Sequence, residues 1–250
     1  MKKPIATIVV AAGIMAAFAE TSTNTGAKGT VTQEKKYPWE SRASAGLTLT
    51  QGNSDSVMVT AALVTGRKTP DNEYSFGLDG TYGKNDSVKN AETYHAFGQY
   101  NHLFSERMFS YVRADYLHDG IAHLNYRLTL SPGAGYYLIK ETNTTMAVEA
   151  GPGVTIRSLG GEHETFATLR LAERFEHKFS SGARVWESLE VLPEVDKWKN
   201  DTLNFEIGAE AAIAKNLGLQ VVLYDTYNTE PAEGLKRNDL KLVSGITYKF

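Results

Sequence analysis

The sequence of 250 residues contains no cysteine. Disulfide bridges and thiolate metal sites are therefore excluded, and an exported chain of this length must be held together by packing and hydrogen bonds. A surplus of basic residues is absent as well, because 26 Lys and Arg stand against 29 Asp and Glu. Since this balance of charges predicts no basic face, we expect no nucleic-acid partner.

A long hydrophobic run is also missing. The most apolar stretch, residues 5–18, is shorter than the about 20 residues that a membrane-spanning helix needs, so an anchor helix is the less favoured interpretation. Two lysines precede this stretch and an Ala-Phe-Ala site follows it, a pattern typical of a secretory signal peptide over residues 1–19. The polar residues 20–36 predict a flexible leader.

What the sequence has from Tyr37 onward is a repeated period of two. In the segment LNFEIGAEAAIA, residues 203–214, apolar side chains alternate with polar or small ones, which in a strand places them on one face. Twelve runs of this kind are predicted, and most have about ten to thirteen residues, close to the length of a tilted strand that crosses a bilayer. Their limits are 39–51, 56–68, 73–83, 91–102, 107–118, 125–138, 145–157, 165–176, 183–193, 202–214, 218–228 and 239–250.

The connections between these runs alternate between short segments and mostly longer, more polar ones. Outer-membrane barrels have short periplasmic turns and longer outer loops, and aromatic residues near the predicted strand ends suit membrane interfaces. We therefore predict an all-β fold over residues 37–250: an antiparallel transmembrane β-barrel of about 12 strands, with 239–250 pairing with 39–51. A secreted soluble β protein is the alternative.

The first predicted strand and the loop after it read WESRASAGLTLTQGNSDS. Trp39, the small residues through Gly46 and the turn at Thr50–Asn53 resemble the salt-induced outer membrane protein family, which is YdiY-like and of unknown function. The resemblance extends to the last residue. It implies the outer membrane of a Gram-negative-type bacterium, brings no catalytic residues, and implies that Tyr248 and Phe250 form a terminal signal for the barrel-assembly machinery.

If the apolar rows face lipid, the opposite rows face inward, because an Arg or Lys on the lipid face near the midplane costs about 2–4 kcal/mol. The inward charges form either a constriction that selects solutes or mutually neutralising pairs that stiffen a narrow barrel. Nearly equal numbers of both signs favour pairs. Inner-row glycines predict some water-filled space or a strongly coiled sheet. The candidate lumen-lining residues are Asp79, Arg113, Asp115, Arg127, Glu149, Arg157, Arg170, Arg174, Glu206, Glu210 and Lys241.

A lipid-modifying hydrolase of the outer membrane is the alternative function. A His-x-Ser pattern would place both side chains on one strand face, but none of the six histidines has a serine two positions on. Asp115, His118 and Asp119 could bind a cation or polarise water at a strand end, although a surface cluster is the simpler interpretation. The sequence therefore predicts a non-enzyme without cofactor or metal. It would be a narrow passive pore for small solutes or ions, or a structural barrel, surrounded by outer-membrane lipid.

Overall fold

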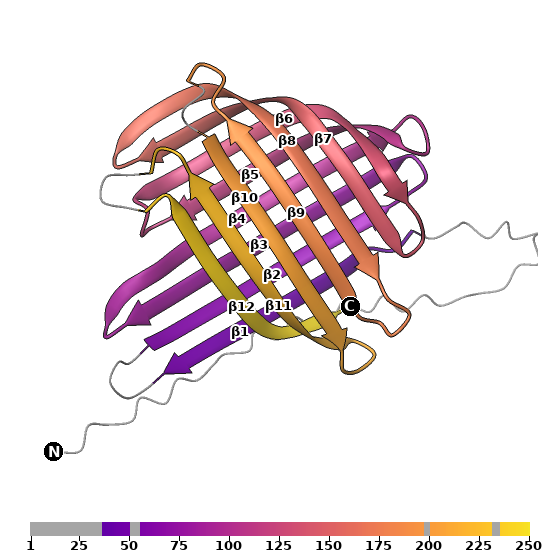
Figure 1. The fold of residues 1–250 in the computed structure, drawn as a ribbon, viewed down its shortest axis with the longest axis horizontal. Helices are drawn as coiled ribbons and strands as arrows, with labels where there is room; N and C mark the ends of the chain where they lie inside the picture. Colours follow the sequence, from indigo (N-terminus) through magenta and orange to yellow (C-terminus); the bar gives the residue numbers. More distant parts are fainter. Residues whose placement is uncertain (1–36, 51–55, 198–200, 232–235) are drawn as a thin grey trace, which may run out of the picture. The chain divides into compact units, whose positions relative to one another are not determined.

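The computed structural model describes residues 37–50, 56–197, 201–231 and 236–250, and these form one closed antiparallel barrel (Figure 1). Each strand pairs with the next along the chain, and the last pairs with the first. The predicted fold class is confirmed. The twelve strands are β1 Glu40–Thr50, β2 Ser56–Lys68, β3 Asn72–Asn85, β4 Val88–Leu103, β5 Met108–Asp119, β6 Leu124–Lys140, β7 Thr144–Leu159, β8 Glu162–Lys178, β9 Arg184–Pro193, β10 Asp201–Ala212, β11 Leu217–Asn228 and β12 Asn238–Lys249.

The predicted signal peptide and leader, and residues 51–53 of the turn that carries the family resemblance, lie outside the described residues. Among the described residues, no helix has the length and hydropathy to span a membrane.

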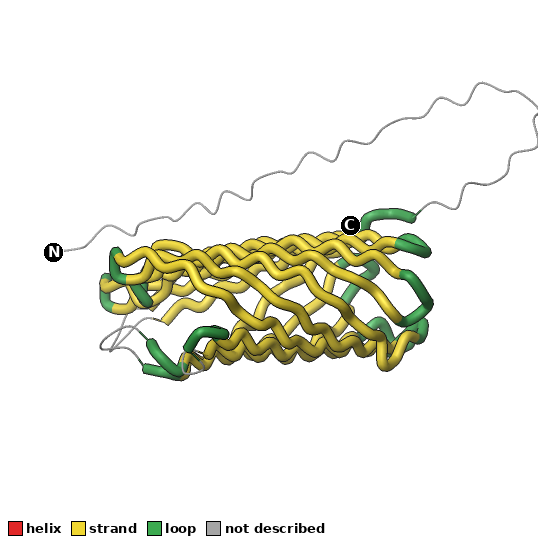
Figure 2. The backbone as a smooth tube through the Cα atoms, turned by 90° about the horizontal axis from the view of Figure 1, so that it is seen from above, coloured by secondary structure: helices red, strands yellow, loops and turns green. Residues whose placement is uncertain are grey.

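The strands cross the barrel wall obliquely (Figure 2), and five of them, β3, β4, β6, β7 and β8, are three to five residues longer than the sequence predicted. The strands β6 and β8 each have 17 residues. We call the end where β1 begins and β12 finishes the terminal end, and the opposite end the far end. At the far end, Asp86 and Ser87 alone connect β3 to β4, and Gly160 and Gly161 connect β7 to β8. All four have positive φ, between 48° and 90°, as tight hairpin turns require.

The predicted sorting of connections by length was therefore wrong for these two hairpins. Polar segments that the sequence suggested were loops, such as residues 83–85 and 162–164, continue the ladders instead. Above the membrane, both faces of a strand meet water, so the apolar alternation fades there while the backbone pairing goes on.

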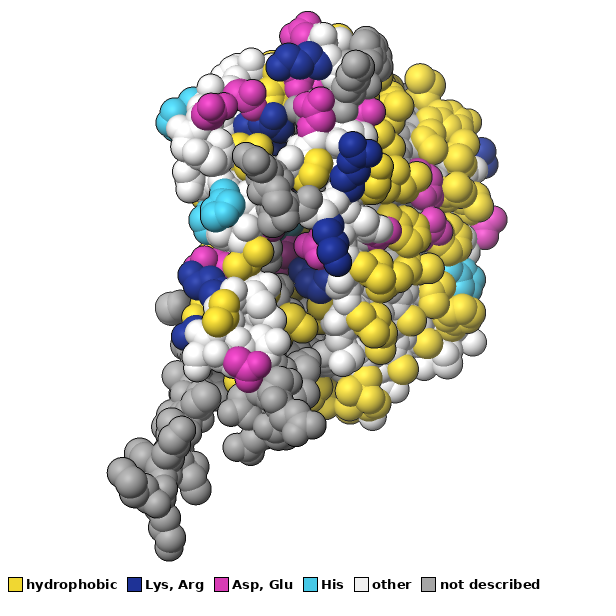
Figure 3. All heavy atoms as spheres, turned by 60° about the vertical axis from the view of Figure 1, so that its left-hand side comes forward, with side chains coloured by type: hydrophobic (Ala, Val, Ile, Leu, Met, Phe, Trp, Pro, Cys, Tyr) yellow, Lys and Arg dark blue, Asp and Glu magenta, His cyan; other side chains and the backbone are white. Residues whose placement is uncertain are grey.

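The outer wall carries the apolar rows. Leu78, Ile207 and Leu242 point outward and are 57%, 44% and 63% exposed, whereas the inward-facing Glu210 is 2% exposed. Figure 3 shows hydrophobic side chains gathered over the wall and charged side chains at the end facing the viewer. Soluble monomers rarely expose a contiguous apolar surface of this kind, whereas a transmembrane barrel requires it.

The inner-row glycines do not open space, which corrects that expectation. Aromatic rings of neighbouring strands lie against them, and the pairs are Gly77 with Phe97, Gly133 with Tyr111, Gly135 with Phe109 and Gly208 with Trp186. A Cβ atom added at Gly135 would lie 2.2 Å from the Phe109 ring. These glycines therefore make room for rings, and the rings fill the interior beside the wall.

The barrel closes between β1 and β12, as predicted, but over a shorter stretch. Residues 42–45 pair with residues 246–249, whereas β1 pairs with β2 along its whole length. At the terminal end, Ser41 and Phe250 exchange backbone hydrogen bonds of 3.1 and 3.2 Å. Further along, Gly46 and Gly245 lie so close to the facing backbone that a Cβ atom at Gly245 would be 2.3 Å from the Ala45 carbonyl oxygen. We call this closure the seam.

Candidate functional site: the charged lumen

All eleven predicted lumen-lining residues lie on the inward rows of their strands. The alternation of buried and exposed positions fixes this orientation for Glu149 on β7, Arg170 on β8 and Glu210 on β10. By their contacts, the eleven residues fall into a central network, a group near the terminal end, a group on the β3–β12 side and two residues of the far half. That they line a solute path stays a prediction.

The central network consists of Gln99, Arg113, Asp115, Glu149, Arg170, Arg174 and Glu190. Glu149 is its centre, with a side chain that is 1% exposed. It accepts hydrogen bonds from Arg170 Nη1 at 2.7 Å and from Gln99 Nε2 at 2.9 Å, and it also pairs with Arg174. Arg170 Nε donates to Glu190 at 2.6 Å. Each buried charge of this centre therefore has an opposite charge in contact.

The central network also crosses the interior. Arg174 on β8 donates to Gln99 Oε1 on β4 at 3.2 Å, although these strands are four positions apart in the barrel order. Arg113 donates to the same oxygen at 3.2 Å and holds Asp115 through bonds of 2.6 to 3.1 Å. These side chains consequently fill the part of the lumen beside β4 to β9.

A histidine extends this network toward the other wall. His95 Nδ1 lies 2.8 Å from Asp79 Oδ1, and its Nε2 lies 3.6 Å from Asp115 Oδ1. The imidazole thus bridges two carboxylates on β3 and β5.

A second group lies near the terminal end. Glu210 accepts a hydrogen bond from Arg184 Nη2 at 3.4 Å and pairs with Lys249. Arg184 also donates to Glu176 at 2.8 Å. Glu206 accepts a bond of 2.5 Å from Trp186 Nε1. These contacts link β8, β9, β10 and β12 on their inward side.

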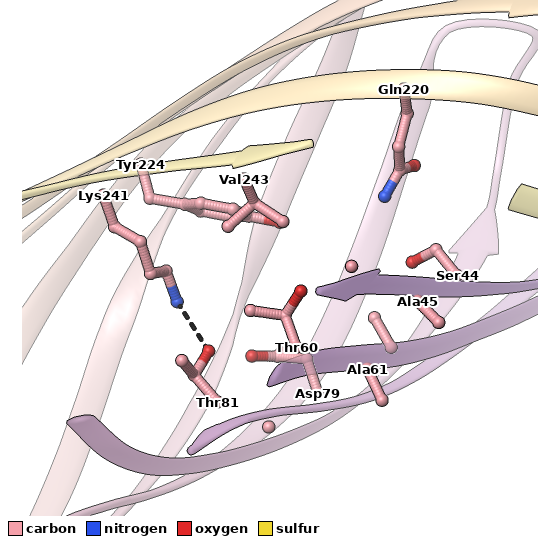
Figure 4. Close-up of a pocket in the computed structure, with 13 residues that line it drawn as sticks. Ser44, Ala45, Thr60, Ala61, Asp79, Thr81, Gln220, Tyr224, Lys241 and Val243 are labelled. Carbon is pink, nitrogen blue, oxygen red and sulfur yellow. Dashed lines mark hydrogen bonds between the residues drawn. The ribbon is translucent and has the colours of Figure 1, made fainter. Parts of the chain in front are cut away.

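The third group lies on the side of β1 to β3, β11 and β12. Lys241 Nζ donates to Thr81 Oγ1 at 3.3 Å and lies 4.8 Å from the centre of the Tyr224 ring. Figure 4 shows Lys241 and Gln220 reaching inward from one wall toward Asp79 and Thr81 on the other. A cavity of about 20 Å³ lies between them, which is room for about one water molecule.

The remaining two predicted residues lie in the far half of the barrel. Arg157 Nε donates to Glu164 at 2.6 Å. Arg127 Nη1 lies 3.5 Å from Thr202 Oγ1 on β10, another contact between strands that are not neighbours.

Sequence reasoning missed Arg184 and Glu190 on β9 because this strand has no clean apolar row. Its outward row includes Glu187, whose register partners are the outward-facing Phe175 and Ile207. Charges on both faces hide the facing of a strand, so the period of two could not assign Arg184 and Glu190 to the interior. The available signal was their spacing, because Arg184 and Glu190 each lie two positions from another inward-facing residue of β9.

The predicted cluster of Asp115, His118 and Asp119 does not assemble, which corrects that suggestion. Asp115 points into the lumen beside Arg113, whereas His118 Nδ1 contacts the carbonyl oxygen of Asn125 at 2.8 Å. Asp119 Oδ1 accepts backbone N–H bonds in the turn that follows β5. Within the ranges that the structure describes, no set of three potential metal ligands comes together.

The histidines do not supply the serine partner that a hydrolase of the expected type needs. Their side-chain hydrogen bonds in the described part of the chain go to aspartate, asparagine, tyrosine, threonine and a backbone carbonyl. These contacts lend no support to the hydrolase alternative.

The two residues predicted as an assembly signal face outward at the terminal end. Tyr248 and Phe250 are 49% and 58% exposed, and their ring centres lie 6.1 Å apart. A similar outward cluster is formed by Trp39, just before β1, Tyr74 on β3 and Tyr100 on β4. The ring centre of Tyr74 lies 6.2 Å from that of Trp39 and 5.2 Å from that of Tyr100. Such rings suit a membrane interface, and a role in assembly stays a prediction.

Comparison with known proteins agrees with the family resemblance. The family model described as "Protein of unknown function, DUF481" matches residues 43–250. "Uncharacterized protein YdiY" of Escherichia coli (strain K12) is 24% identical over 221 residues, which cover 86% of this chain and 84% of that protein.

Among solved structures, the chain is similar to a KdgM porin at a TM-score of 0.48 and 8% identity, covering 85% of this chain and 99% of that one. It is also similar to the NanC porin at a TM-score of 0.49 and 5% identity, covering 84% and 96%.

Proposed function

The chain belongs to the DUF481 family of proteins of unknown function, and we propose that this member is a narrow water-filled channel in the outer membrane of a Gram-negative-type bacterium. Residues 1–19 would direct its export. The closed barrel and its apolar outer wall support a membrane location, because a closed barrel satisfies its backbone hydrogen bonds without water.

The observation that carries the proposal is the uneven filling of the interior. Val64 on β2 faces inward, since its register partners are Arg42 and Gly77, yet it is 43% exposed. Glu149 and Arg170, on the opposite part of the wall, are 4% and 2% exposed. An inward apolar side chain can be this exposed only if solvent space adjoins it. Val64 comes four residues before the end of β2, so the free space lies beside β2 toward the terminal end.

The charges at this space set what would pass through it. The side chains of Asp79 and His95 are 41% and 30% exposed, and Lys241 reaches in from β12. Charges of both signs border the path, so we expect weak ion selectivity. The central network limits the width, which favours small solutes. Twelve strands lie between the eight that leave room only for side chains and the sixteen that form a wide channel.

Single-channel recording of the refolded barrel in planar bilayers tests the proposal. Wild type should give discrete conductance steps, and Val64→Trp should lower their size because the indole ring occupies the free space. Val59→Trp is the matched control: Val59 lies on the same strand and is similarly exposed, at 44%, but faces outward. Correctly folded wild type without steps would make this a structural barrel instead. Equal steps in both variants would also contradict the channel path.

A further inference from the structure

A hydrophobic groove of about 350 Å³ runs across the outer wall from β8 to β12. We call it the outer groove. It follows one row of outward-facing register partners, in which Phe175 faces Glu187, Glu187 faces Ile207, Ile207 faces Leu223 and Leu223 faces Leu242. The small side chain of Ala209 leaves room at the bottom of the groove. The groove is therefore separate from the lumen, and its volume falls in the usual range of ligand pockets.

Two carboxylates break this apolar surface. Glu187 lines the outer groove, and Glu173 lies on the outward row of β8, with Leu189 of β9 as its register partner. One oxygen of Glu173 is buried without a hydrogen-bond partner. Neither side chain forms a salt bridge with any described residue of the chain. Figure 3 shows acidic side chains among the hydrophobic ones of the wall.

The height of Glu187 along the barrel suits a lipid headgroup, and Glu173, five residues before the end of β8, lies about 5 Å further from the terminal end. Glu187 comes three residues after the start of β9 at the terminal end. At about 3.3 Å per residue and a strand tilt of about 40°, this is about 8 Å above the strand end. Leu223 comes six residues after the start of β11, and Leu242 seven before the end of β12. The outer groove thus rises from the interface toward the membrane interior.

An occupant of the outer groove must combine hydrocarbon along its length with a cation at its lower end. A second copy of the chain fits poorly, because a two-fold contact sets the same patch against itself and would enclose the carboxylates of both copies in one apolar contact without a cation. A primary ammonium group offers three hydrogen-bond donors to the carboxylates. We propose that the outer groove binds a phospholipid with a primary ammonium headgroup, held by Glu187 and Glu173.

Native mass spectrometry of the refolded barrel tests this, in micelles that contain equal amounts of phosphatidylethanolamine and phosphatidylcholine with the same acyl chains. A charge-assisted hydrogen bond contributes about 1.5–3 kcal/mol, so wild type should retain the primary-ammonium lipid at least about tenfold better. Glu187→Gln should bring this preference close to one. Ala209→Phe should abolish retention of both lipids, whereas the control Ala134→Phe, outward on β6, should behave as wild type.

Equal retention of the two lipids by wild type would overturn the proposal, as would an unchanged preference in Glu187→Gln. A dimer mass that disappears in Ala209→Phe would overturn it in favour of a second copy in the outer groove. All these substitutions lie outside the lumen, so their outcome does not depend on whether the barrel conducts.

Discussion

Replacing Glu149 with glutamine should strongly destabilise the barrel. The substitution keeps the size of the side chain but removes the negative charge that Arg170 and Arg174 share. Arg170 retains Glu190 at 2.6 Å. Two cations then face a single carboxylate at a site where the Arg170 side chain is 3% exposed.

Breaking a buried ion pair from one side costs about 3–5 kcal/mol. The lower end applies here, because the amide oxygen of glutamine still accepts one hydrogen bond and because Arg174 is 34% exposed and partly hydrated. We therefore expect a loss of about 3 kcal/mol in the free energy of unfolding, which is more than a hundredfold in the folding equilibrium. The matched control is Glu164→Gln, whose partner is Arg157. Its side chain is 38% exposed, and such a pair contributes about 1 kcal/mol or less.

Urea unfolding of the barrel in phospholipid vesicles, followed by tryptophan fluorescence and by heat-modifiable gel mobility, measures both variants. A double variant, Glu149→Gln with Arg174→Met, restores one positive charge against one negative charge and should recover part of the loss. If the free energy of unfolding of Glu149→Gln is within about 0.5 kcal/mol of wild type, the ion pairs of Glu149 with Arg170 and Arg174 do not stabilise the barrel.

Three further outcomes are expected. Ile207→Lys should impair membrane insertion, because this side chain meets lipid, whereas Glu206→Gln on the inward face should still assemble; wild-type gel mobility for both would contradict the facing. Gly135→Ala should lower the free energy of unfolding by about 1–3 kcal/mol, because the added methyl would collide with Phe109; a neutral result in urea unfolding would show that the ring moves aside. Deleting Phe250 should reduce the amount of barrel in outer-membrane fractions of cells far more than the refolding yield in vitro, since the fold loses two backbone hydrogen bonds and the ring contact with Tyr248. Normal assembly in cells would show that the residue is ordinary strand.

Sequence periodicity predicted the strands and their facing wherever one row is apolar. The strand β10 is the clearest case, since Ile207 points outward and Glu206 inward in the structure, as the alternation indicates. The same rule fails where polar residues occupy both faces. On β9, Glu187 faces outward and Glu190 faces the lumen, and the type of residue does not distinguish them; only their spacing of three positions places them on opposite faces.

The contacts of the lumen could not be predicted because they depend on barrel closure. Arg174 and Gln99 are 75 positions apart in sequence, and the curvature of the wall decides which inward side chains meet. The glycines illustrate the same limit. Whether Gly135 opens space or receives a ring depends on the neighbouring Phe109, which the pattern of β6 alone does not reveal.

The seam makes the barrel wall mechanically uneven. Every other junction joins strands that are consecutive in the chain and can form as a hairpin, whereas the seam must bring together segments about two hundred residues apart. In the described residues the seam has four register pairs. It therefore has the least backbone pairing of any junction to offset the entropic cost of closing so long a loop. We expect amide hydrogens of residues 42–45 and 246–249 to exchange with solvent before those of the central strands. Local opening of the wall would then separate β1 from β12. The two strand edges that it exposes carry Gly46 and Gly245.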